Sequence, residues 1–81
     1  MTKIRNQEIL IEFGRNIKLL RKAQNISQAQ LAFEANIPRE QVGRIERGQV
    51  NTALSTIVAL SKALKTHPNN LLKINYGEDF T

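Results

Sequence analysis

The side chains best suited to hydrogen-bonding chemistry gather in residues 37–48, IPREQVGRIERG, which hold three arginines and two glutamates. A guanidinium group stays charged and donates in a fixed fork, which suits phosphates and the acceptor edges of purine bases. Drawn as a helix at about 100° per residue, the stretch directs Val42 and Ile45 to one side. The other side carries Arg39, Glu40, Gly43, Arg44 and Arg47. Three arginines and one glutamate give this side a net charge of +2. A solvated surface is the simplest interpretation of it.

Other kinds of chemistry have little support in the sequence. His67 is the single histidine, and its place beside Pro68 fits a turn at a helix start better than a metal ligand or a base. Cysteine is absent, so neither a disulfide nor a thiolate metal site can form. The seven carboxylates are scattered, and no glycine-rich phosphate loop or nucleophile elbow occurs. We therefore expect no enzyme activity, no cofactor and no metal.

The composition predicts one small basic domain that spans residues 1–81. Hydrophobic residues make up 41% of the chain but aromatic residues only 5%, so the core must be built from Leu, Ile, Val and Ala, as in small packed helices. The net charge of +5 favours an anionic partner, usually nucleic acid and sometimes a membrane surface. No apolar run reaches the roughly 20 residues of a membrane span. The first residues, MTKIRNQE, do not resemble a secretory signal, and we expect a cytoplasmic protein.

Helical periodicity covers most of the chain, and no segment alternates as a strand. The boundary residues have specific roles: Ser27 as an N-cap, Asn36 in a left-handed turn, Gly48 as a terminator and Pro68 in a first helical turn. The expected helices cover residues 7–24, 28–35, 39–47, 54–65 and 68–74. In the fourth helix, the expected buried stripe is Leu54, Ile57, Leu60, Ser61 and Leu64. The sequence therefore predicts an all-α bundle of five helices, with residues 75–81 as a flexible or partner-dependent tail.

Residues 28–47 read as a helix, a tight turn and a second helix. Ala32 is small where the two helices would cross, while Val42 and Ile45 would face back onto the first helix of the chain. This arrangement leaves the second helix protruding, able to lie in the roughly 12 Å wide major groove of B-DNA. Gly43 costs about 1 kcal/mol relative to alanine inside a helix. Either a bulky surface must approach the backbone there, or the glycine is simply tolerated at an exposed position.

The stretch QAQLAFEANIPREQVGRIERG, followed by NTALSTIVALSKAL, resembles the helix-turn-helix domain of the lambda repressor and Cro type, also called the xenobiotic-response-element family. The resemblance covers residues 13–72 and implies a five-helix, lambda repressor-like DNA-binding domain. Two positions depart from the family pattern. Asn36 stands where the family usually has glycine, and Pro38 stands where a serine or threonine usually caps the third helix.

The resemblance also implies roles for individual residues. Base-reading positions of the family match Arg39, Glu40, Gly43 and Arg44. Backbone-contacting positions match Gln28, Arg47, Gln49 and Asn51. Because arginine suits guanine and glutamate can accept from cytosine N4, a half-site that contains G·C pairs is a hypothesis. Either base-reading arginine could equally contact phosphate alone, and Gln28 could be no more than a first-turn residue. The family pattern pairs Arg21 and Glu46 as a partly buried ion pair, which we assign to structure.

The predicted function is a sequence-specific regulator of transcription that binds double-stranded DNA, most simply a repressor. A single reading helix offers few base contacts, so we expect a homodimer on a palindromic operator with half-sites about 34 Å apart. Candidates for the dimer interface are Leu71, Leu72, Ile74, Tyr76 and Phe80, which could instead close the core over the first helix. The alternative is a protein-interaction module or antitoxin-type partner that keeps the fold mainly to bind another protein. A phage repressor, a restriction–modification controller and an antitoxin paired with a toxin all remain open, whereas a membrane-surface helix does not fit a buried bundle.

Overall fold

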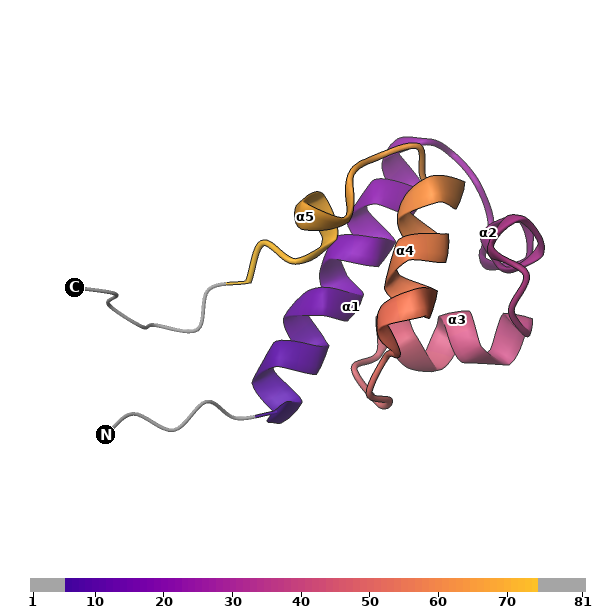
Figure 1. Ribbon diagram of the computed structural model, residues 1–81. Coiled ribbons are helices and arrows are strands. Elements are labelled where there is room, and N and C mark those ends of the chain that lie inside the picture. Colours follow the sequence, from indigo (N-terminus) through magenta and orange to yellow (C-terminus); the bar gives the residue numbers. More distant parts are fainter. Residues whose placement is uncertain (1–5, 75–81) are drawn as a thin grey trace, which may run out of the picture.

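The computed structural model describes residues 6–74, and this part of the chain forms helices and no strand (Figure 1). The elements are α1 (Asn6–Ala23), α2 (Gln28–Ala35), α3 (Arg39–Glu46), α4 (Leu54–Ala63) and α5 (Pro68–Leu71). The predicted all-α fold of five helices is confirmed. Two of the candidate dimer residues, Tyr76 and Phe80, lie outside the described residues, as does the rest of the predicted tail, 75–81.

Local signals set the boundaries of the two central helices. The Ser27 side chain accepts a hydrogen bond from the Gln30 backbone N–H at 3.0 Å and so caps α2. Asn36 ends α2 in the left-handed conformation with φ 60°. Gly48 follows α3 with φ 73°, a conformation that favours glycine. Pro38 precedes α3 and provides no side-chain hydrogen bond, so α3 begins without a side-chain cap.

Four helices end earlier than the periodicity predicts, α1 by a single residue, at Ala23. The backbone of Arg47 leaves the helical region at φ −89° and ψ 0°, so α3 ends at Glu46. The chain turns at Lys65, which is left-handed with φ 56°, and α4 therefore stops at Ala63. The last helix, α5, is a single turn instead of the seven residues expected for 68–74. After α4 and α5 the apolar pattern continues, with Leu64 and with Leu72 and Ile74, which is why periodicity alone extends these two helices too far.

The core lies where α1, α2, α3 and α4 meet, and α5 covers one end of it. Leu71 of α5 is completely buried, so it closes the core and is not available to a second copy of the chain. This corrects its assignment as a dimer candidate. Leu54, placed in the buried stripe of the fourth helix, is instead 75% exposed, because it is the first residue of α4 and lies beyond the packed part of the helix. The buried apolar residues are Phe13, Ile17, Leu31, Ala32, Ala35, Val42, Ile45, Leu60, Ala63, Leu64 and Leu71.

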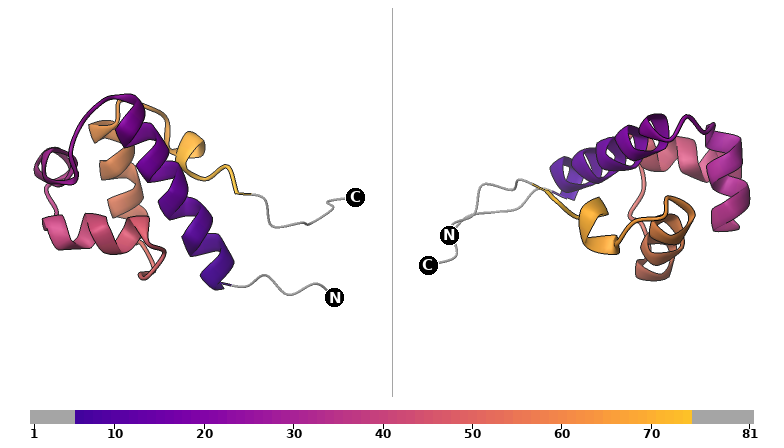
Figure 2. Two further views of the ribbon diagram at one scale, coloured as in Figure 1. Left: turned by 180° about the vertical axis from the view of Figure 1, so that it is seen from behind. Right: turned by 90° about the horizontal axis from the view of Figure 1, so that it is seen from above.

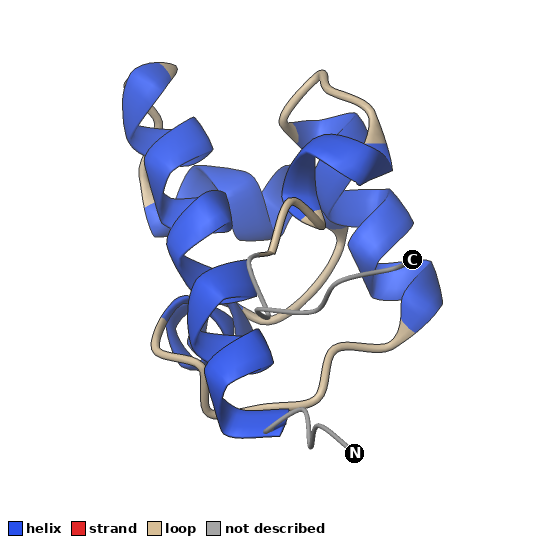
Figure 3. Cartoon of the chain, turned by 90° about the vertical axis from the view of Figure 1, so that its left-hand side faces the viewer, coloured by secondary structure: helices blue, strands red, loops and turns tan. Residues whose placement is uncertain are grey.

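The arrangement of the helices leaves α3 at the edge of the molecule. Figure 1 shows α3 below α2 and beside the foot of α4, and the two views of Figure 2 place α2 at the end of the molecule away from α5. The side view in Figure 3 shows the helices joined by loops throughout the described part. Within residues 6–74, no helix combines the length and the apolar character needed to cross a membrane.

Candidate nucleic-acid interface

The inner side of α3, defined by Val42 and Ile45, is fixed to the rest of the domain. Both side chains are buried in the core. Gly14 of α1 lies directly against the α3 backbone: a Cβ at this position would stand 2.2 Å from the Ile45 carbonyl oxygen and 2.8 Å from the Glu46 carbonyl oxygen. Because real Cβ atoms do not approach an oxygen that closely, only glycine permits this contact between α1 and α3.

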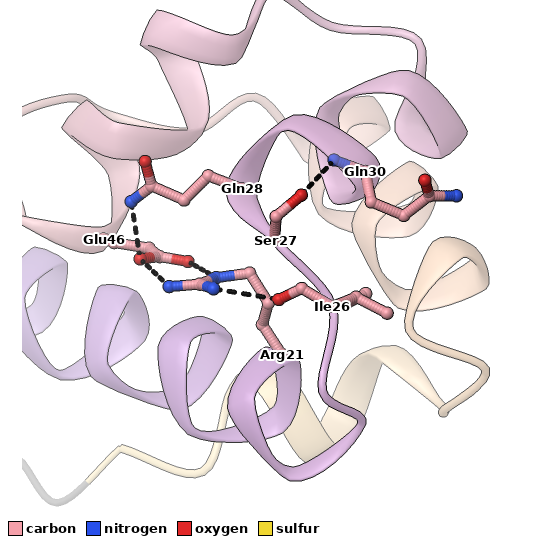
Figure 4. Close-up of polar contacts among 6 residues, drawn as sticks. All are labelled: Arg21, Ile26, Ser27, Gln28, Gln30 and Glu46. Atoms are coloured by element: carbon pink, nitrogen blue, oxygen red, sulfur yellow. Dashed lines mark hydrogen bonds and ion pairs between the residues drawn. The ribbon is translucent and has the colours of Figure 1, made fainter.

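A buried ion pair adds a polar attachment on the same side. Arg21 of α1 donates from Nε to Glu46 Oε2 at 2.7 Å and from Nη2 to Glu46 Oε1 at 3.1 Å (Figure 4). The side chains of the two residues are only 10% and 3% exposed. The remaining guanidinium nitrogen, Nη1, donates to the Ile26 carbonyl oxygen at 2.9 Å. Arg21 therefore connects α1, the loop before α2 and the end of α3, which is the structural position expected for this pair.

Gln28, the first residue of α2, belongs to the same network. Its amide nitrogen Nε2 donates to Glu46 Oε1 at 3.0 Å (Figure 4). The sequence reasoning missed this bond, because Gln28 and Glu46 lie 18 residues apart and no local pattern links them. Gln28 is half-buried, so it is more closely held than an ordinary first-turn residue.

The outer side of α3 faces solvent. Arg39, Glu40, Arg44 and Arg47 are all exposed. Together with two other residues they surround a surface depression of about 250 Å³, here called the recognition hollow. Its lining residues are Gln28, Arg39, Glu40, Gly43, Arg44 and Arg47. The structure thus brings all four residues predicted to read bases to one place, with two of the four predicted phosphate-binding residues.

The sequence places Gly43 on the exposed side of the third helix, but in the structure this residue is not exposed. It is buried, because the side chains of two neighbours lie over it. A Cβ at this position would stand 3.2 Å from Arg47 Nη1 and 3.8 Å from Gln28 Oε1. Gly43 is therefore the floor of the recognition hollow, and its missing side chain leaves room for Arg47 and Gln28.

The other two predicted phosphate-binding residues follow α3 and are exposed. Gln49 lies beside the hollow and accepts a hydrogen bond from Arg47 Nε at 3.2 Å. Asn51 lies apart from it, at a second and smaller depression of about 140 Å³. Two of the dimer candidates, Leu72 and Ile74, line this second depression. Leu72 is 45% exposed and Ile74 is half-buried, so both retain apolar surface.

Comparisons with known proteins identify the family of this chain. A model of the helix-turn-helix family matches residues 17–71. The chain is 40% identical over 65 residues to the control protein C.BamHI of Bacillus amyloliquefaciens, a match that covers 79% of this chain and 80% of the relative.

Two solved structures share the fold. The restriction-modification controller protein C.AhdI from Aeromonas hydrophila is 42% identical with a TM-score of 0.76, over 76% of this chain and 94% of that one. The P22 c2 repressor, solved in complex with a synthetic operator, is 33% identical with a TM-score of 0.71, over 75% and 92% of the two chains. The family model and these relatives agree with the placement of α2 and α3, and the chain belongs to the helix-turn-helix family of DNA-binding transcription regulators, which are not enzymes.

Proposed function

We propose that the protein binds a specific operator by laying α3 in the major groove of double-stranded DNA. The observation that carries the proposal is the contrast across α3, whose inner side is fixed by Gly14 and Arg21 while its outer side is exposed and basic. A helix held along one side only can enter a groove without disturbing the core. The P22 c2 repressor, which shares the fold, has been solved in complex with a synthetic operator, and this supports binding to an operator.

Within the recognition hollow, Arg39, Glu40 and Arg44 read bases. Arg39 and Glu40 are exposed at the start of α3, the end of a recognition helix that contacts base edges, and Arg44 is exposed on the same side in its last turn. Arginine suits the O6 and N7 acceptors of guanine, and glutamate accepts from cytosine N4, so G·C pairs belong in each half-site.

Residues at and beyond the end of α3 contact the DNA backbone. Arg47, Gln49 and Asn51 are exposed there, and the hydrogen bond from Arg47 to Gln49 aligns the first two. Contacts to phosphate carry no base information but fix the register of α3 in the groove.

The active form is a homodimer on a palindromic operator. An α3 of eight residues presents few base contacts, and a second copy doubles them at a spacing of about 34 Å. Exposed apolar surface for the interface comes from Leu54 at the start of α4 together with Leu72 and Ile74 near the end of the described chain. The proposal includes residues 1–81 as one domain that acts in the cytoplasm.

Among the regulators considered, a controller of a restriction–modification system has the best support. The relatives at 40% and 42% identity carry the names of a control protein and of a restriction-modification controller protein. Neither name describes a module that only binds protein, so the alternative of an antitoxin-type partner is not favoured.

Selection of bound duplexes from random DNA tests the proposal. We expect enrichment of one palindrome, with affinity that falls steeply as salt rises, in proportion to the number of phosphates neutralised. Sedimentation of the purified chain on that palindrome should show two copies per duplex. Weak binding that is equal on all sequences, together with a protein that co-purifies in fixed ratio, would favour the protein-interaction module instead.

A further inference from the structure

The side chain of Asn16, on α1, holds the chain that follows the last helix. Its amide nitrogen Nδ2 donates to the Leu71 carbonyl oxygen at 3.0 Å and to the Lys73 carbonyl oxygen at 3.1 Å. These acceptors lie 55 and 57 residues along the chain from Asn16. An asparagine amide carries two N–H donors on one nitrogen and can serve both carbonyls at once, whereas aspartate, of nearly the same shape, has no donor when ionised.

The segment held in this way, residues 72–74, has no helix of its own. The last helix, α5, ends at Leu71, whose side chain is buried in the core. Leu72 and Ile74 then line the second depression described above. The two bonds from Asn16 flank Leu72, with one carbonyl acceptor on each side of it. The backbone is therefore fixed both before and after Leu72, which sets the direction of its side chain.

An apolar surface that is already ordered associates more tightly than a loose one. A segment that is ordered only on association loses conformational entropy at that step, which lowers the affinity. Leu72 is 45% exposed and so retains apolar surface for a partner. Asn16 does not line the recognition hollow. An effect of Asn16 on DNA binding is therefore expected to pass through the 72–74 segment.

We infer that Asn16 is a positioning residue for the homodimer: it holds Leu72 and Ile74 in the arrangement in which a second copy of the chain binds them. This inference rests on the proposed function, which places these two residues in the dimer interface, and it adds the residue on which that interface depends. A purely structural role of Asn16 would lower the stability of the domain and leave the affinity between two copies unchanged.

Gln24, which directly follows α1, provides a matched control. Its amide nitrogen Nε2 also donates to a distant backbone carbonyl oxygen, that of Leu64, 40 residues away. Leu64 is completely buried at the end of α4 and does not line the second depression. Gln24→Ala and Asn16→Ala thus remove the same kind of hydrogen bond, but only Asn16→Ala releases the 72–74 segment.

Sedimentation equilibrium of the full chain measures the dissociation constant of the dimer. Asn16→Ala should raise this constant about 10-fold, because both copies must then order their 72–74 segments on association. Gln24→Ala should leave the constant unchanged. Operator binding by Asn16→Ala should weaken together with the dimer. Joining two copies of this variant by a flexible linker should restore operator binding, because linkage makes the association intramolecular.

Leu72→Asp separates the inference from the proposal on which it rests. This variant places a charge in the interface and should dissociate the dimer. If Leu72→Asp leaves the dimer intact, or if the wild-type chain is a monomer both free and on the operator, the proposed interface fails and the inference fails with it.

The remaining outcomes test Asn16 alone. If Leu72→Asp dissociates the dimer but Asn16→Ala does not, the interface stands and the inference is wrong. The inference is also wrong if Gln24→Ala weakens the dimer as much as Asn16→Ala does, because the effect would then follow from stability. Should Asn16→Ala unfold, Asn16→Ser takes its place and is judged by the same measurements.

Discussion

The two sides of α3 use the same residue types for opposite purposes. On the inner side, Gly14 lets two backbones touch and Arg21 is buried in an ion pair. On the outer side, Gly43 lies under flexible side chains and Arg44 is exposed. The role of a glycine or an arginine in this domain therefore depends on its surroundings. Beside the backbone of a neighbouring helix it stabilises the fold, and at the solvent-exposed side it is available to bind DNA. Stability should depend on the inner side and DNA selectivity on the outer side.

The largest expected effect is the loss of the inner arginine. Arg21→Ala leaves the carboxylate of Glu46 buried without its partner, which should cost about 3–5 kcal/mol of unfolding free energy. Thermal unfolding followed by circular dichroism measures this loss. Arg44→Ala, the matched substitution on the outer side, should change the free energy of unfolding by less than about 0.5 kcal/mol. Equal melting temperatures for Arg21→Ala and the wild type would contradict the division between the two sides.

The two glycines give the next largest contrast. In Gly14→Ala the added carbon meets backbone oxygens that cannot move without displacing α3, and we expect a loss of about 2–3 kcal/mol in urea unfolding. In Gly43→Ala the nearest atoms belong to the Arg47 and Gln28 side chains, which can turn aside. Helix propensity then favours alanine by up to about 1 kcal/mol. Gly43→Ala should therefore unfold no earlier than the wild type but bind the operator less selectively. A Gly14→Ala protein as stable as the wild type would show that the close contact between Gly14 and the α3 backbone is not needed.

The DNA-binding selectivity of Arg44→Ala tests the role of the outer side of α3. If Arg44 reads a guanine, the variant should lose about 1–3 kcal/mol of discrimination at one base pair while its affinity for other sequences changes little. Competition assays with single-base variants of the operator measure this. A uniform loss on all duplexes would instead assign Arg44 to the DNA backbone.

The smallest expected effect comes from a substitution outside both sides of α3, at Lys65. Lys65, which follows α4, has φ 56°, a left-handed conformation that costs a non-glycine residue about 1 kcal/mol or more. Glycine avoids this cost, but it also gives the unfolded chain more conformational entropy, which offsets part of the gain. Lys65→Gly should therefore stabilise the domain by about 0.5 kcal/mol. Operator selectivity should stay unchanged, since Lys65 does not line the hollow. A change in selectivity would mean that stability and base reading are not separable in this fold.

Features that act over a few residues could be predicted from the sequence. The Ser27 cap, the left-handed Asn36 and the Gly48 terminator each follow from the chemistry of one residue and its neighbours, so the boundaries between α2 and α3 were predicted closely. The exposed positions of α3 follow from helical periodicity. Family resemblance, in turn, supplied the pairing of Arg21 with Glu46.

Contacts among three elements could not be predicted in this way. The hydrogen bond from Gln28 to Glu46 and the cover over Gly43 depend on how α1, α2 and α3 meet in space. Whether Leu71 closes the core or joins a dimer interface was left open by the sequence for a related reason. An apolar residue near a chain end looks the same whether it packs on its own core or on a partner, and only the position of α5 distinguishes the two cases.

The uncapped start of α3 has a thermodynamic consequence. A helix of eight residues that follows Pro38 is far too short to persist by itself in water, so a peptide cut from residues 28–47 should be largely unstructured. DNA that binds the folded domain and not the unfolded chain also raises the stability of the domain. At an operator concentration one hundred times the dissociation constant, bound DNA adds about 2.7 kcal/mol to the stability of the folded domain. A rising melting temperature on titration with duplex is thus a direct readout of the complex.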